Sequence, residues 1–269
     1  MPDTLQDLSP SALITAIEAS EIAYYRNFSR LPNAELYDEP NLLWLASGLP
    51  VFNTVLHAHT TEEKLGPEIE RVVAYFRSRK LAFNWYVGPL SQPANIREHL
   101  PRYGVQHDED EPGMALDLYE LNEDVPLAPA LVIQQVTSDD LLLQWLHTWG
   151  FPVPEDSIQH FFAAYQSLYG ENEPLRFFLG FLDGRPVATS ALFEGAGVAR
   201  VEHVVTVPDV RRQGIGATMT LAALHEARAL GYRVSVLRAS PYGIHIYRRL
   251  GFREYCMMST YVWSPQDAP

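Results

Sequence analysis

The apolar and polar positions of the chain alternate in some stretches with the period of a strand and in others with that of a helix. The β-branched residues 204–207 end at Pro208, whose nitrogen cannot donate to a sheet ladder. An Ala- and Leu-rich segment of helical character follows and continues to Gly231. This stretch therefore predicts a strand, a short turn and a helix.

A similar order of elements is predicted twice along the chain. Each series consists of a strand, a long helix, a second strand, a short helix and a third strand. This repetition predicts a tandem arrangement of two similar halves. The first series covers residues 52–59, 62–81, 83–87, 94–103 and 114–119. The second consists of strand 204–207, the helix ending before Gly231, strand 232–239, a short helix ending at Leu250 and strand 257–263.

The two halves are joined by a predicted linker. Residues 122–130 combine charges with two prolines and interrupt the apolar pattern. Further along, Asp183 and Gly184 form a strong turn signal between two apolar strands, which predicts a hairpin. The predicted domains are therefore residues 1–124 and 125–269.

The turn before the long helix of the second half has the composition of an anion-binding loop. It contains Arg211 and Arg212, followed by Gly214 and Gly216 where the first N–H groups of a helix have no intrahelical acceptor. Such N–H groups and the positive end of the helix dipole can hold a phosphate, and glycine lets the ligand approach the main chain. The alternative is an ordinary turn with solvated arginines. A P-loop and a dinucleotide fingerprint are excluded, because the loop lacks G-K-[ST] and has Met219 at the third glycine position.

The remaining pattern, R-x-x-G-x-G after V-x-V-P, resembles the acyl-coenzyme A loop of the GCN5-related N-acetyltransferase (GNAT) superfamily, whose form is [RQ]-x-x-G-x-[GA]. The resemblance continues downstream, where a predicted strand is followed by S-x-x-G, from Ser240 to Gly243, and by Y-R-R-L-G-F, from Tyr247 to Phe252. Two ordered motifs at the expected separation are more specific than either alone.

The resemblance implies an α+β (α/β) fold of two GNAT-like domains, each with a central, mostly antiparallel mixed sheet flanked by helices. In the first half, the loop that corresponds to the anion-binding loop reads AHTTEE, residues 58–63, which is acidic and contains no glycine. It offers no phosphate cradle. The first half is therefore predicted to be a degenerate domain that shapes the substrate side or supports its partner.

The superfamily geometry also implies roles for single residues of the second half. Main-chain groups of Val205 and Val207 would pair with the pantetheine arm and polarise the thioester carbonyl, and Ser240 would hydrogen-bond the pantetheine. Tyr247 would face the departing thiolate, and a packing role is its alternative. The diphosphate of acetyl-coenzyme A (acetyl-CoA) would be held by Arg211, Arg212, Gln213, Gly214, Ile215, Gly216 and Ala217.

Three candidates for the general base remain. Glu202 and His203 both precede the predicted strand 204–207, which we call the thioester strand. Strand alternation sends their side chains to opposite faces, so that at most one of them faces the acceptor. A bulge, which the resemblance implies, would change that count. We select Glu202, while His203 has a suitable intrinsic pKa and an ordered water is the third candidate. For both residues the alternative is a polar strand position at a solvated edge.

Composition narrows the classes of function. A net charge of −13 disfavours nucleic acid and anionic membranes as partners, and it would attract cationic amines as readily as it would serve solubility. The single cysteine, Cys256, excludes an internal disulfide and a cysteine-cluster zinc site. His57 and His59 share a strand face without a third ligand, so no metal is predicted. The chain has no apolar run of about 18 residues and no signal peptide, which predicts a soluble, cytoplasmic protein.

Three functions are compatible with these observations. The first, which we predict, is an N-acetyltransferase that moves an acetyl group from acetyl-CoA to a primary amine of a small molecule. The second is a noncatalytic acyl-CoA-binding sensor or scaffold, and the third is an interaction protein that keeps the loop only as fold geometry. The intact loop and Tyr247 argue against the third. The acceptor, the acyl chain length and the oligomeric state do not follow from the sequence.

Overall fold

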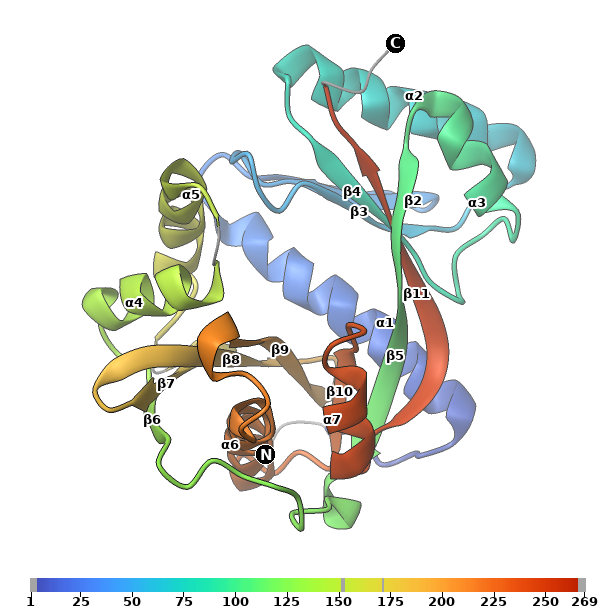
Figure 1. Ribbon diagram of the computed structural model, residues 1–269. Coiled ribbons are helices and arrows are strands. Elements are labelled where there is room, and N and C mark those ends of the chain that lie inside the picture. Colours follow the sequence, from blue (N-terminus) through green and yellow to red (C-terminus); the bar gives the residue numbers. More distant parts are fainter. Residues whose placement is uncertain (1–3, 151–152, 171, 266–269) are drawn as a thin grey trace. The chain divides into compact units, whose positions relative to one another are not determined.

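The computed structural model describes residues 4–150, 153–170 and 172–265, and the chain divides into two compact units (Figure 1). Unit 1 consists of residues 1–20 and 113–255, and unit 2 of residues 21–112 and 256–269. Each unit contains a mixed, mostly antiparallel sheet with helices packed on it, which confirms the predicted fold class.

The sheet of unit 1 has the strand order β5-β10-β9-β8-β7-β6. Neighbouring strands are antiparallel except β9 and β10, which run parallel. β7 and β8 form the predicted hairpin, and the positive φ angles of Asp183 (51°) and Gly184 (78°) fit a type I′ turn. The strands are β5 (Gln106–Asp117), β6 (Val132–Gln135), β7 (Leu175–Leu182), β8 (Arg185–Gly195), β9 (Val198–Thr206) and β10 (Val234–Arg238).

Helices cover both faces of the sheet of unit 1. α4 (Asp139–Trp149) and α5 (Glu155–Gln166) lie over one face of β7–β9, and α6 (Ile215–Ala229) lies over the other (Figure 1). The helix α7 (Ile244–Leu250) follows β10, and the short 3₁₀ helices η3 (Leu118–Glu120) and η4 (Pro208–Val210) lie in connections. The apolar face of α6 is fully buried against the sheet, which fixes the position of the helix and of the loop that precedes it.

The sheet of unit 2 has the order β1-β2-β3-β4-β11, with β3 and β4 parallel. The apolar residues that predicted the helix over residues 62–81 are buried in α2, which packs against this sheet. α1 contributes residues to both units. The elements are α1 (Pro10–Asn27), η1 (Phe28–Arg30), β1 (Glu35–Asp38), β2 (Leu42–Ala46), β3 (Thr54–Ala58), α2 (Glu62–Arg79), β4 (Phe83–Val87), α3 (Ile96–His99), η2 (Leu100–Tyr103) and β11 (Arg253–Trp263).

The compact units differ from the predicted ranges 1–124 and 125–269. Residues 113–117 of β5 belong to unit 1, where they pair with β10, and residues 259–263 of β11 pair with β4 in unit 2. Each unit thus takes a strand from the other half of the sequence. The local pattern of a strand does not specify its partner, so this exchange could not be read from the apolar periodicity.

Candidate functional site

The candidate site lies where β9 and β10 stop pairing. Ser235 pairs with Ala199 and Val236 with Arg200, and within the described residues the ladder ends there although β9 continues to Thr206. The last part of β9 therefore has no strand neighbour on this side. In α/β sheets, ligands bind outside the carboxyl ends of parallel strands, which is the location of this opening.

β9 carries a bulge immediately before the opening. Ala191 of β8 faces Glu202 and Thr189 faces Val205, so the one residue between them on β8 is opposite two residues of β9. His203, the first of those two, has a φ of 55°, in the left-handed region that residues other than glycine seldom adopt. The predicted bulge is therefore present, and simple alternation no longer separates the side chains of Glu202 and His203.

The ladder decides which main-chain groups face the opening. The N–H of Val207 donates to the carbonyl of Val187 at 3.0 Å and is thus directed to β8. Because hydrogen-bonded pairs alternate in an antiparallel ladder, Val205 also faces β8 and Thr206 faces the opening. The carbonyl of Thr206 accepts a hydrogen bond from Nε of Arg211 at 2.9 Å. The sequence analysis named Val205 and Val207 as pantetheine contacts and did not name Thr206. The contacts of Val205 and Val207 with pantetheine remain a prediction.

The predicted anion-binding loop follows β9 and leads into α6. Arg212 and Gly214 both adopt left-handed conformations, with φ of 61° and 81°. Within the described residues, none of the backbone N–H groups of residues 212–217 donates a hydrogen bond to a protein acceptor. Ile215 and Ala217 bury their side chains, so they present only main-chain groups. The loop therefore offers consecutive unsatisfied donors at the positive end of a helix.

The two glycines of this loop have different surroundings. A Cβ on Gly214 would lie 2.7 Å from the carbonyl carbon of Leu127, so the linker main chain packs directly against this residue. A Cβ on Gly216 would lie 3.0 Å from Cδ1 of Ile246 and 3.9 Å from Oγ1 of Thr206. Gly216 thus faces the end of β9 and α7, and the structure brings together the loop, the end of β9 and the helix of Tyr247.

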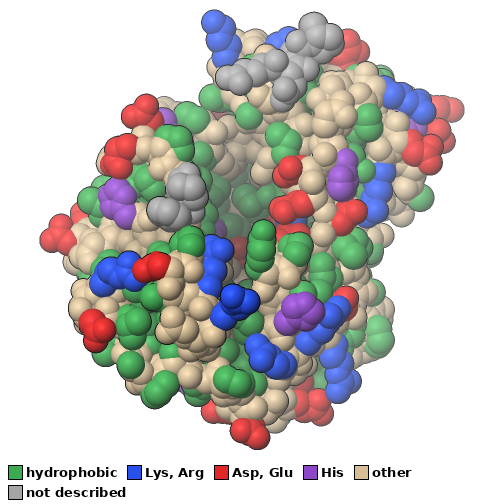
Figure 2. All heavy atoms as spheres, viewed as in Figure 1, with side chains coloured by type: hydrophobic (Ala, Val, Ile, Leu, Met, Phe, Trp, Pro, Cys, Tyr) green, Lys and Arg blue, Asp and Glu red, His purple; other side chains and the backbone are tan. Residues whose placement is uncertain are grey.

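Basic side chains surround this loop although the chain carries a net charge of −13. Figure 2 shows basic side chains gathered over the ends of α6 and α7. Among the described residues, Arg211, Arg212 and Arg249 are exposed and form no ion pair with a carboxylate. Their charge adds to that of the helix terminus and favours an anion at the loop.

The two downstream motifs are connected through Gly243. The Ser240 carbonyl and Oγ accept the N–H of Gly243 at 3.0 and 3.3 Å, which holds the start of α7. Tyr247 is 7% exposed, and a Cβ on Gly243 would lie 3.1 Å from its Oη. The glycine of S-x-x-G therefore makes room for the phenol. Ser240 has a structural role here, and its predicted contact with pantetheine remains a prediction.

Glu202, the selected base, takes part in a partly buried ion pair. Its carboxylate accepts a hydrogen bond from Nε of Arg200, a residue that is 2% exposed. The guanidinium also lies 3.3 Å from Oγ of Ser20. A buried guanidinium requires such a carboxylate partner, so the position of Glu202 has a structural cause apart from catalysis. Its role as base remains a prediction.

His203, the other candidate, is enclosed by aromatic rings. Its Nε2 lies 2.9 Å from Oη of Tyr165, and its ring centroid lies 5.4 Å from that of Trp145 and 4.8 Å from that of Trp149. Burial, with a further contribution from the charge of Arg200, holds the pKa of His203 well below its ordinary value. The imidazole is therefore neutral at pH 7, with one nitrogen engaged by Tyr165.

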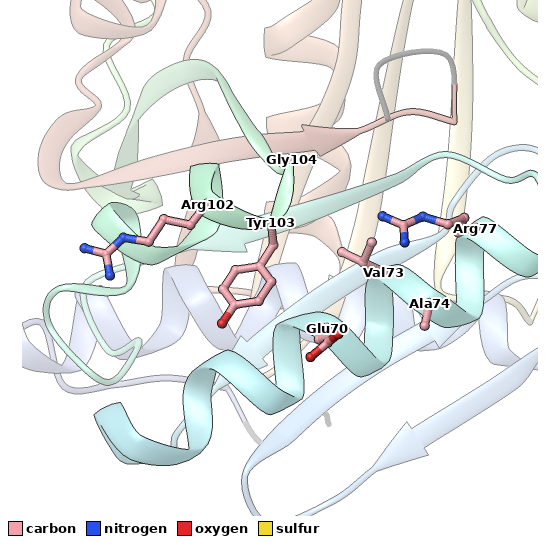
Figure 3. Close-up of a pocket in the computed structure, with 7 residues that line it drawn as sticks. All are labelled: Glu70, Val73, Ala74, Arg77, Arg102, Tyr103 and Gly104. Carbon is pink, nitrogen blue, oxygen red and sulfur yellow. The ribbon is translucent and has the colours of Figure 1, made fainter. Parts of the chain in front are cut away.

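Unit 2 has a hollow of about 250 Å³ beside α2 (Figure 3). The Tyr103 ring points from η2 toward α2 at this hollow. None of the predicted site residues lines it, because they all lie in unit 1. The lining residues are Glu70, Val73, Ala74, Arg77, Arg102, Tyr103 and Gly104.

The histidine pair of β3 also lies in unit 2. The rings of His57 and His59 stack with centroids 6.1 Å apart, and burial followed by the charge of His59 lowers the pKa of His57. In the described residues, no group of three or more His, Cys, Asp or Glu side chains is placed to hold a metal ion. None of the helices in that same part of the chain is both long and apolar enough to cross a membrane.

Comparison with known proteins identifies the family of this site. Residues 139–252 match the family model described as Acetyltransferase (GNAT) family. A comparison with curated proteins gave no match. Among solved structures, a GCN5-related N-acetyltransferase from Kribbella flavida is similar with a TM-score of 0.70 and 20% identity, over 91% of this chain and 95% of that one.

Two further solved structures are similar over nearly the whole chain. A tandem GNAT protein from the clavulanic acid biosynthesis pathway has a TM-score of 0.60 at 15% identity, with 97% of each chain covered. A GCN5-related N-acetyltransferase from Sphaerobacter thermophilus has a TM-score of 0.61 at 14% identity, over 97% of this chain and 94% of that one. At these identities the likeness shows the fold, whereas the family rests on the match to residues 139–252. Residues 139–252, which contain this site, therefore form a domain of the GNAT acetyltransferase family.

Proposed function

We propose that this chain is an N-acetyltransferase that moves an acetyl group from acetyl-CoA to a primary amine of a small molecule, without a metal ion. The observation that carries the proposal is the run of N–H groups at residues 212–217, which has no protein acceptor within the described residues. A diphosphate supplies both the acceptors and the negative charge that suit this run and the arginines beside it. Acetyl-CoA, the acetyl donor of the GNAT family, contains such a diphosphate.

The end of β9 suits the acyl-pantetheine arm. Thr206 directs its main-chain groups into the space where β9 has lost its strand neighbour. Pantetheine contains amide groups, and an extended chain of amides can pair with an open strand edge as an added strand does. We therefore propose Thr206 as the residue whose main chain pairs with pantetheine, because the main-chain groups of Val205 and Val207 face β8. Nε of Arg211, which now donates to the Thr206 carbonyl, would share or release that acceptor.

The proposed reaction forms a carbon–nitrogen bond and breaks a carbon–sulfur bond. The neutral amine attacks the thioester carbonyl, the amine loses a proton, and the departing thiolate of coenzyme A gains one. Tyr247 is the proposed donor to the thiolate, because it follows Ile246, whose side chain borders Gly216 of the diphosphate loop. The amine proton leaves through an ordered water or through Glu202, if that carboxylate accepts it while still paired with Arg200.

A noncatalytic acyl-CoA sensor is the second candidate function. One observation favours it: both titratable residues that precede the thioester strand are engaged inside the protein. Glu202 is paired with Arg200, and His203 is hydrogen-bonded to Tyr165. A sensor needs the diphosphate loop but no base.

The two candidates are separated by binding and turnover measured on the same preparation. Acetyl-CoA affinity is measured by calorimetry, and free thiol is then measured with acetyl-CoA and a panel of primary amines. Acceptor-dependent thiol release supports the enzyme, binding without release supports the sensor, and absence of binding contradicts both. In the enzyme, Tyr247→Phe should lower kcat about a hundredfold and leave acetyl-CoA affinity unchanged, because it removes only the proton donor.

We further propose that the first half of the chain is a degenerate GNAT-like domain. α2 begins after Thr61 and has Glu62 and Glu63 in its first turn, so its positive end is already offset by carboxylates. Such a domain would support the second half or shape its substrate side. We also propose a cytoplasmic location, and from the acidic net charge we infer that the protein has no nucleic-acid or membrane partner.

A further inference from the structure

The bulge of β9 is held at two points by residues of other elements. The carbonyl of His203 accepts a hydrogen bond from Oγ1 of Thr189 on β8 at 2.7 Å, and its Nε2 lies 2.9 Å from Oη of Tyr165 on α5. Thr189 and Tyr165 are both fully buried. The conformation of His203 is thus determined by packed parts of the domain and not by a local turn.

The side chain of His203 offsets a conformation that is unfavourable for its backbone. Glycine adopts a φ near 55° without an energetic cost, whereas the same φ is unfavourable for a residue that carries a Cβ. The imidazole lies edge-on to the rings of Trp145, Trp149 and Tyr165, at interplanar angles of 85°, 72° and 77°. Edge-to-face aromatic contacts and a partly buried hydrogen bond are both favourable, so the ring acts as an anchor for the strained residue.

The bulge decides where the next residues of β9 point. Without the extra residue, every main-chain group after His203 would change sides, and Thr206 would face β8 and not the opening. In acyl transfer, a displacement of about 1 Å in a positioning group can lower the rate about a hundredfold. The contacts that hold His203 therefore determine which main-chain groups face the thioester.

We propose that His203 is a positioning residue, held by Tyr165, that aims the main chain of Thr206 at the thioester of acetyl-CoA. This inference rests on the proposed acetyltransferase function. His203 does not exchange protons with the substrate in this role, because its Nε2 is engaged by Tyr165 of α5. The Tyr165 hydroxyl affects catalysis only through the bulge.

Tyr165→Phe tests the proposal, and Tyr169→Phe is its matched control. Each removes one phenolic oxygen from the same domain: that of Tyr165 binds His203, and that of Tyr169 donates to Asp139 at 2.8 Å. We expect Tyr165→Phe to lower kcat about tenfold while KM for acetyl-CoA stays within about twofold. The control should keep the wild-type kcat. A purely structural role would lower the unfolding midpoint and leave the kcat of the folded protein unchanged.

A second measurement does not depend on turnover. If the bulge holds the thioester carbonyl, the wild-type protein binds acetyl-CoA more tightly than CoA in calorimetry, and Tyr165→Phe should lose that preference while keeping its affinity for CoA. His203→Asn tolerates the left-handed conformation but is too short to reach Tyr165, so it should lose the preference as well. The double variant should be no worse than either single variant, because both remove one interaction.

The outcomes separate the positioning role from the proposed function. Equal kcat and equal ligand preference in Tyr165→Phe and Tyr169→Phe would overturn the role of His203 and leave the acetyltransferase proposal standing. A wild-type protein that binds acetyl-CoA but never releases thiol would overturn the enzymatic proposal, and the preference for acetyl-CoA over CoA would still decide whether His203 aims the thioester. A wild-type protein that does not bind acetyl-CoA would overturn both.

Discussion

Replacing Gly216 by aspartate tests the diphosphate loop with little effect on the fold. Gly216 is the second residue of α6, and a Cβ there would face Cδ1 of Ile246 at 3.0 Å and Oγ1 of Thr206 at 3.9 Å. The nearer neighbour is the far end of a flexible side chain, which can shift. The new carboxylate therefore enters the space bordered by the unsatisfied N–H groups of the loop.

The expected change in stability is small because the contributions oppose one another. Removing glycine from a helix gains a few tenths of a kcal/mol, and an acidic residue in the first turn gains about 0.3–1 kcal/mol from the helix dipole. Crowding against Ile246 at 3.0 Å offsets part of this gain. We expect the free energy of unfolding to stay within about 1 kcal/mol of the wild-type value.

The expected change in binding is large. The carboxylate occupies the donors that would hold the diphosphate and adds a like charge, and two like charges about 4 Å apart repel by about 4 kcal/mol at an effective dielectric constant of 20. Even two thirds of that value lowers affinity about a hundredfold. Gly216→Ala is the control, because it adds the same Cβ without the charge.

A substitution at Gly214, in contrast to one at Gly216, is expected to reduce the stability of the fold. Its φ of 81° costs an L-residue about 1–2 kcal/mol, and a Cβ would lie 2.7 Å from the main chain of Leu127, whose displacement costs about 1–3 kcal/mol. Gly214→Ala should therefore lose about 2–5 kcal/mol of stability and lower the unfolding midpoint by on the order of 5–15 °C. The change Gly214→Asp would for the same reason destabilise the fold as well as repel the ligand.

Calorimetry with acetyl-CoA and thermal unfolding of each variant provide the assay. We expect Gly216→Asp to unfold near the wild-type midpoint and to show no measurable binding, and Gly216→Ala to keep most of its affinity. Wild-type affinity in Gly216→Asp would refute the loop as the diphosphate site. An unchanged midpoint in Gly214→Ala would refute the packing of the linker against the loop.

Two further predictions concern Glu202 and His203. Glu202→Gln should lower the free energy of unfolding by about 1–3 kcal/mol, because buried Arg200 loses a charged partner, and a loss of kcat with unchanged denaturant unfolding would instead favour Glu202 as base. His203 has a pKa far below the ordinary 6.5, so below pH 6.5 the unfolded chain binds a proton that the folded chain does not. Stability should therefore fall as the pH decreases below 6.5, by up to about 1.4 kcal/mol per pH unit, and denaturant titrations of His203→Asn should show a shallower fall. Equal slopes would contradict a neutral imidazole in the folded chain.

The parts of the site that the sequence predicted are those with local causes. Gly214 adopts the left-handed conformation that its residue type permits, and the turn at Asp183 and Gly184 has the φ angles that its sequence requires. The spacing of apolar residues over residues 62–81 predicted α2 (Glu62–Arg79) almost to its ends. In each case, the physical determinant lies within a few residues of the feature.

The parts that the sequence did not predict depend on partners far away in the chain. Thr206 faces the opening because of the register with β8 and the bulge at His203, neither of which local alternation reveals. Glu202 is committed to Arg200, whose burial also depends on packed neighbours such as Ser20. The exchange of β5 and β11 between the two units depends on the strands with which they pair. Strands of similar composition do not specify these partners.

The first turns of α2 and α6 differ in charge, which leads us to predict one acetyl-CoA site per chain. α6 has no acidic residue in its first turn, whereas α2 begins with Glu62 and Glu63. In α2 the helix dipole is offset by the chain itself, and the phenol of Tyr103 lies against Gly66 in the second turn. A diphosphate at α2 would thus meet like charge and an occupied surface. Calorimetry should therefore give one acetyl-CoA per chain, lost in Gly216→Asp; a second site, or binding that survives this substitution, would show that the acidic helix terminus also accepts the ligand.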